Sequence, residues 1–256
     1  MIAIRLNLVW TLFWHRFVPR NRQETLKLVW VFAEPAGQIA IMLAIFSFIG
    51  RHGGYGPSFA LFLLTGVAVL TVVQRAMTAV ATAVTALRSP RRLPTIGPLT
   101  DTLAAALFVG YTALLYTAAL AWAIGHWQHV NTVPVALGWV VLALVAAMAL
   151  GFGLGLIRGY ADRFAPIVTR SFALISRTLI FISGVFYMPS LLPPALRDAL
   201  AWNPVLQIVE LMRRGFYGPS YPSLVLDPRY LGFCVALTAT FGMVLVWANR
   251  RRLYEL

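Results

Sequence analysis

The chain has 256 residues, of which 60% are hydrophobic and 11% are charged, and its mean hydropathy is +0.78. Soluble domains are about half apolar and about a quarter charged, so this chain has more apolar surface than a soluble domain of its length can bury. The formal net charge of +13 comes mostly from Arg residues in short gaps between apolar runs. That placement is typical of membrane topology, and it argues against nucleic-acid binding. We expect a single membrane domain over residues 1–256.

The N-terminal segment, residues 1–17, has the periodicity of an amphipathic helix. Its apolar side chains recur at helical spacing, while Arg5, His15 and Arg16 lie elsewhere on the helical wheel. The apolar set is Ile2, Leu6, Val9, Trp10, Phe13 and Phe17. The segment has no small-residue cleavage site of a signal peptide. The pattern predicts an interface helix lying on the cytoplasmic leaflet.

Six apolar stretches are each long enough to cross a hydrocarbon core of ~30 Å as a helix. They cover residues 28–49, 59–87, 103–124, 133–157, 166–187 and 230–248. Basic residues cluster before the first stretch, after the second, around the start of the fifth and in the C-terminal tail. The other gaps hold almost none. By the positive-inside rule both termini are expected to be cytoplasmic.

Small residues recur every four positions along the fourth stretch, at Ala147, Gly151, Gly155 and Gly159. Such a stripe allows two helices to approach closely. The neighbour is either another helix of the same chain or a second copy across a dimer seam, and packing inside one chain is favoured.

Four charged residues fall at membrane depth, namely Glu34, Arg75, Arg177 and Glu210. Charges at such depth are costly, so they mark either function or a paired contact. Arg75 is close enough to the cytoplasmic end of its span to reach that surface, and we assign it no special role. Arg177 is near the middle of the fifth span and requires another explanation.

Arg163, Arg170 and Arg177 are seven residues apart, which places them on one face of a continuous helix, and Phe181 and Gly184 continue that face. Two interpretations remain open. Arg177 pairs with Glu34 and ties two helices together, or the row of arginines lines a path for a polyanionic substrate.

Residues 188–218, between the fifth and sixth spans, are interrupted by four prolines. Two short helices are expected near 195–202 and 205–214. The second has an apolar face opposite Gln207, Glu210 and Arg214, and this face consists of Val205, Ile208, Val209 and Met212. Neither helix can cross a bilayer, so they predict an outer-leaflet hairpin that is re-entrant or lies flat.

The sequence lacks the motifs of several catalytic and cofactor sites. Lys27 is the single lysine and has no Gly-rich turn before it, so the chain cannot form a P-loop. Its four histidines have no neighbouring carboxylate or thiol to complete a metal site, and Cys234 is the single cysteine. We therefore expect no cofactor or metal in this chain. A membrane-embedded enzyme and a proton-coupled carrier are disfavoured.

Four short motifs resemble one known family when taken in order. They are WVFAEP at residues 30–35, SGVFYMP at 183–189, WNP at 202–204 and IVELMR at 208–213. Together with the span order, they make the chain similar to the permeases of type-2 ABC polysaccharide exporters. Among these, it most resembles the capsular polysaccharide export permeases of the inner membrane of Gram-negative bacteria.

The resemblance implies a non-catalytic homodimer that works with two copies of a P-loop ATPase, which binds ATP and Mg²⁺. It also implies a periplasmic co-polymerase and an outer-membrane export protein as further partners. A loop at 87–99 with Arg88, Arg91 and Arg92 would dock on the ATPase. The implied substrate path, for an acidic, lipid-linked glycan, comprises Trp30, Phe32, Glu34, Arg163, Arg170, Arg177, Phe181 and Tyr187. Export of O-antigen or teichoic acid, and an ABC permease for lipids or drugs, are alternatives.

Overall fold

The computed structural model describes residues 6–17, 22–49, 54–86 and 98–249, and this part of the chain contains helices but no strand. The α-helices are α1 (Leu6–Phe17), α2 (Arg22–Phe48), α3 (Phe59–Thr85), α4 (Pro98–Gln128), α5 (Leu137–Phe164), α6 (Pro166–Ile182), α7 (Pro194–Ala201), α8 (Pro204–Tyr217) and α9 (Pro228–Ala248). Five of these, α2, α3, α4, α5 and α9, are long and apolar enough to cross a membrane. The prediction of an all-helical membrane protein is confirmed.

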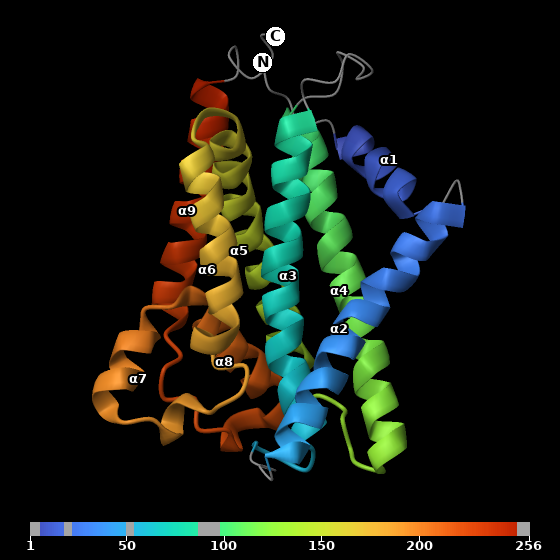
Figure 1. The fold of residues 1–256 in the computed structure, drawn as a ribbon, viewed down its shortest axis with the longest axis vertical. Coiled ribbons are helices and arrows are strands. Elements are labelled where there is room, and N and C mark those ends of the chain that lie inside the picture. The colour runs from blue at the N-terminus through green and yellow to red at the C-terminus, as the bar shows by residue number, and fades with distance from the viewer. Residues whose placement is uncertain (1–5, 18–21, 50–53, 87–97, 250–256) are drawn as a thin grey trace.

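Helix α3 lies in the middle of the bundle, with α4 on one side and α5 behind it (Figure 1). Its first turn is capped by Ser58, whose Oγ accepts a hydrogen bond from the backbone N–H of Leu61 at 3.2 Å. Small and branched apolar side chains make up most of α3, and its first four turns are buried almost completely. The helix therefore forms the core against which the others pack.

The small-residue stripe of α5 faces α3. A Cβ atom added at Gly151, Gly155 or Gly159 would lie 2.7 Å from a side-chain atom of α3. These contacts confirm that the stripe serves packing inside one chain. The close approach of α5 to α3 explains why glycine recurs there every four residues.

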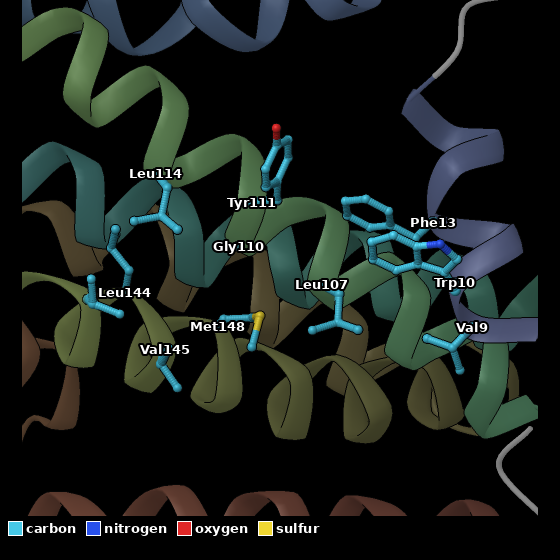
Figure 2. Close-up of a pocket in the computed structure, with 11 residues that line it drawn as sticks. Val9, Trp10, Phe13, Leu107, Gly110, Tyr111, Leu114, Leu144, Val145 and Met148 are labelled. Atoms are coloured by element: carbon cyan, nitrogen blue, oxygen red, sulfur yellow. The ribbon is translucent and has the colours of Figure 1, made fainter. Parts of the chain in front are cut away.

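Helix α1 packs against α4 and confirms the expected amphipathic helix. Val9 and Phe13 are buried, while Trp10 is mostly exposed. At the end of α1, Nη2 of Arg16 is 2.9 Å from a carboxylate oxygen of Asp101 in α4. Figure 2 shows the apolar cavity, of about 300 Å³, that lies between α1, α4 and α5.

The expected fifth span, residues 166–187, consists of α6 and the loop that follows it, and a break in the helical backbone separates it from α5. Ala165 has φ −144° and ψ 73°, so α5 ends at Phe164 and a new helix begins at Pro166. Proline is well suited to a first helical position because it has no N–H to leave unpaired. Helix α6 then ends at Ile182 after 17 residues, before Gly184, whose φ of +69° is outside helical geometry.

The two helices α7 and α8 occupy the end of the molecule opposite α1 (Figure 1), and the prediction of two helices in residues 188–218 is confirmed. Asn203 fixes the start of α8. Its Oδ1 accepts from the N–H of Val205, and its Nδ2 donates to the carbonyl of Ile182. Gln207 and Glu210, which the helical periodicity places opposite the apolar face of α8, are buried together with that face.

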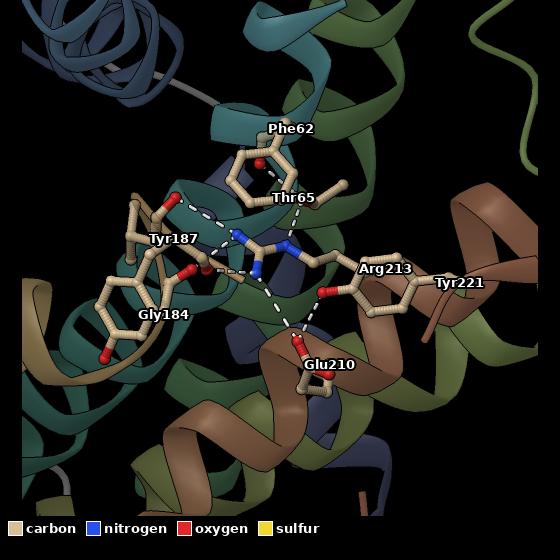
Figure 3. A network of polar contacts seen from close by, with 8 residues as sticks. Phe62, Thr65, Gly184, Tyr187, Glu210, Arg213 and Tyr221 are labelled. Atoms are coloured by element: carbon tan, nitrogen blue, oxygen red, sulfur yellow. Dashed lines mark hydrogen bonds and ion pairs between the residues drawn. The ribbon is translucent and has the colours of Figure 1, made fainter. Parts of the chain in front are cut away.

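Arg213 explains how polar side chains of α8 are accommodated in the core (Figure 3). Its guanidinium donates to the carbonyls of Gly184, Val185 and Tyr187 and contacts Thr65 Oγ1. It lies 3.7 Å from the ring centroid of Phe62 and 3.6 Å from Glu210. The Tyr221 hydroxyl donates to Glu210 at 2.7 Å. Arg213 thus joins α8, α3 and the loop after α6.

Candidate functional site

A polar groove runs between α2 and α3 at the depth of the membrane-length helices. The first part of the groove, a cavity between these two helices, has a volume of about 660 Å³. Helix α2 contributes Trp30, Glu34 and Gln38, and α3 contributes Gln74 and Arg75, along with smaller residues. The lining is unusual for helices of such apolar composition, since polar groups at this depth need a partner or water.

A second cavity, of about 400 Å³, continues the groove toward α6. It shares Gln38, Gln74 and Thr78 with the first and adds Arg158 from α5 and Arg177 from α6. We call the two cavities together the cationic groove. It is defined by Trp30, Glu34, Gln38, Gln74, Arg75, Thr78, Arg158, Ser176 and Arg177.

Gln74 links α3 to α6 beside the second cavity. Its Nε2 donates to the backbone carbonyl of Ser176 at 2.8 Å. This carbonyl lies on α6 one residue before Arg177. The bond therefore sets how α6 presents its arginine to the groove.

The charges of the cationic groove do not balance. It contains three guanidinium groups, those of Arg75, Arg158 and Arg177, and one carboxylate, that of Glu34. Arg158 donates to Thr78 Oγ1 at 3.2 Å and is 3.8 Å from Asp162, which lies outside the groove lining. Arg177 is exposed and has no hydrogen bond or ion pair to any residue in the described part of the chain. The groove therefore offers positive charge to an anion.

The structure brings together three of the eight residues expected to form the substrate path. Trp30, Glu34 and Arg177 line the cationic groove. The other five, which lie on α2, α5, α6 and the loop after α6, are not among its lining residues. They are Phe32, Arg163, Arg170, Phe181 and Tyr187. Arg88, Arg91 and Arg92, expected to contact an ATPase, lie outside the described residues.

Two of the sequence-based interpretations need correction. The row of arginines does not lie on one helix, because Arg163 belongs to α5 and Arg170 and Arg177 belong to α6. Glu34 pairs with Arg75 at 2.6 Å, and no ion pair joins it to Arg177 in the part of the chain that the structure describes. Arg75, to which we assigned no special role, is the partner of Glu34.

The sequence does contain a signal for the Arg75 contact. Pro35 lies inside α2 and has no N–H, so the carbonyl of Val31, four residues earlier, lacks its helical donor. Arg75 Nη1 donates to that carbonyl at 2.9 Å. The sequence also places Arg75 at membrane depth, and it could have been predicted to donate to the carbonyl that Pro35 leaves without a donor. No comparable signal places Arg158 in the groove, because its neighbours come from three different helices.

No protein-family model matches the chain. The chain is 25% identical over 241 residues to the polysialic acid transport protein KpsM of Escherichia coli, covering 91% of this chain and 90% of that protein. It is 24% identical over 250 residues to the capsule polysaccharide export inner-membrane protein CtrC of Neisseria meningitidis, covering 96% and 92%. The chain is similar to capsule export proteins along nearly its whole length. The resemblance expected from the four motifs is confirmed, and both relatives are named as polysaccharide transport or export proteins, CtrC as one of the inner membrane.

Proposed function

We propose that this chain is the membrane-spanning permease subunit of an ATP-driven exporter, and that it moves an acidic, capsule-type polysaccharide across the inner membrane. The observation that carries the proposal is the cationic groove, in which Arg75 and Arg158, on helices long enough to span a membrane, line the same groove as Arg177 of α6. A water-filled path is the setting in which such charges are tolerated. The similarity to KpsM and CtrC over most of the chain supports the substrate class.

The membrane arrangement that we propose is the six-span topology predicted from the sequence. Helix α6 is the remaining span, with the loop after Ile182 completing the crossing, so that six spans keep both termini in the cytoplasm. The α7–α8 hairpin lies in the outer leaflet, opposite α1. This assignment is supported by the arginine-rich gaps and by the position of α1 and the end of α9 at one end of the molecule (Figure 1).

The exporter is a homodimer in which two grooves face one another. Helix α2 is mostly exposed, and Trp30 and Phe32 are among its exposed aromatic side chains. A second copy against the α2 and α6 side would enclose the groove and place these rings along a glycan. Two copies of a P-loop ATPase hydrolyse ATP on the cytoplasmic side and contact residues 87–99. A periplasmic co-polymerase and an outer-membrane protein carry the glycan onward to the cell surface.

Arg177→Gln in the source bacterium tests this function. We expect surface polysaccharide to fall at least tenfold and glycan to accumulate inside the cell, while the amount of protein in the membrane stays unchanged. Surface glycan and membrane-protein abundance are measured together. The matched control is Arg229→Gln, which removes an exposed arginine at the start of α9, outside the groove. Normal export by the Arg177 variant would overturn the proposed path.

A further inference from the structure

The guanidinium of Arg75 is divided between two acceptors on α2. Nη1 donates to the carbonyl of Val31, which Pro35 leaves without a helical donor, at 2.9 Å. Nη2 donates to Glu34 Oε2 at 2.6 Å. Nη1 therefore supplies a hydrogen bond that α2 lacks, and Nη2 binds a carboxylate.

The two partners differ in their exposure. The side chain of Arg75 is 19% exposed, whereas that of Glu34 is 53% exposed, and both line the first part of the cationic groove. Ion pairs that reach solvent stabilise little, so Glu34 can leave Arg75 at small cost. The bond to Val31 would meanwhile keep the guanidinium in place. A planar guanidinium with one free edge is well matched to a carboxylate or phosphate oxygen.

Arg75 also lies within reach of the other groups that a charged sugar would need. Trp30 lines the same part of the groove and is largely exposed. Gln38, Gln74 and Thr78 connect this part to the one that contains Arg158 and Arg177. A chain with an acidic group on successive sugars could therefore occupy Arg75 and Arg177 together.

We propose that Arg75 is an anion-binding residue for the exported glycan, and that Glu34 is an internal carboxylate which the acidic group of the sugar displaces. The inference rests on the proposed function and adds the residue that recognises the negative charge of the exported glycan. The pair then acts as a selectivity device. A neutral sugar cannot replace Glu34 on Arg75, so the ion pair stays intact and Arg75 does not bind that sugar.

The experiment measures binding of oligosialic acid to the purified protein in lipid nanodiscs, with carboxyl-reduced oligosialic acid as the neutral control. Glu34→Gln removes the internal competitor, so affinity for the acidic oligomer should rise about two- to fivefold, as expected for a weak exposed pair. Arg75→Gln should lower that affinity at least tenfold. Neither change should alter binding of the carboxyl-reduced oligomer.

The double variant Glu34→Gln with Arg75→Gln separates exchange from a general charge effect. If Glu34 competes for Arg75, its removal adds nothing once Arg75 is gone, and the double variant binds like Arg75→Gln. A gain that persists in the double variant overturns the proposal. Pro35→Ala in the Arg75→Gln background restores the missing helical N–H, so reduced binding there cannot be ascribed to a loosened α2.

Failure of the inference is distinct from failure of the proposed function. If the wild type binds the acidic oligomer and Arg75→Gln binds it equally well, the exchange is wrong and the exporter role stands. If the wild type binds the acidic and the carboxyl-reduced oligomers equally, or binds neither, both proposals are contradicted.

Discussion

Arg213 and Arg214 are neighbours on α8, yet they have different surroundings. Arg213 is completely buried among three backbone carbonyls, the ring of Phe62 and Glu210. Arg214 is half-buried, with its guanidinium 5.2 Å from the ring centroid of Trp139. Arg213→Met would leave Glu210 without its cationic partner and the carbonyls without their donor. We expect it to lower the free energy of unfolding by about 3–5 kcal/mol, measured by denaturation in detergent.

Arg214→Met is the matched control and should cost no more than about 1 kcal/mol, the value of a partly exposed cation–π contact. Replacing Glu210 by Gln in the Arg213→Met background should recover part of the loss, since it removes the unpaired charge. Equal destabilisation by the two arginine substitutions would contradict the role of Arg213 in joining α8 to α3.

At the scale of the element, α5 contains two glycines in opposite environments. A Cβ atom at Gly155 would lie 2.7 Å from Val80 Cβ and 2.8 Å from the carbonyl oxygen of Met77, whereas one at Gly138 would have no neighbour within 4 Å. Gly155→Ala should separate α5 from α3 and lower the free energy of unfolding by about 1–3 kcal/mol. Gly138→Ala should be neutral or slightly stabilising. Thermal unfolding of the two purified variants compares them directly, and equal melting temperatures would refute the close approach at Gly155.

At the scale of the whole molecule, the proposed orientation is testable with single cysteines. In a Cys234→Ala background, a cysteine at Asn131, between α4 and α5, should react with an impermeant thiol reagent added to intact cells. A cysteine at Glu255, which lies outside the described residues, should react only after the membrane is opened. Labelling of position 255 in intact cells, with none at 131, would reverse the orientation inferred from arginine placement.

Of the six predicted spans, five coincide with helices that are long and apolar enough to cross a membrane. These five could be predicted because helix length and hydropathy are local properties. The prediction that Arg163 shares one continuous helix with Arg170 and Arg177 was wrong, because the break at Ala165 lies between Arg163 and the other two. The burial of the polar side chains of α8 could not be predicted from the sequence. Amphipathicity shows which residues are polar, but buried partners such as Tyr221 for Glu210 come from elsewhere in the chain.

By itself, the sequence determined that the protein is an all-helical membrane protein with an amphipathic N-terminal helix, and that it resembles capsule exporters. It also singled out Trp30, Glu34 and Arg177 for the site. Only the tertiary structure decided that Glu34 pairs with Arg75 and that Arg158 joins Arg177 in one groove. The physical reason is that periodicity places a side chain on its own helix. Its partner depends on which helices pack together and at what height, as where α3 packs against α2, α5 and α6.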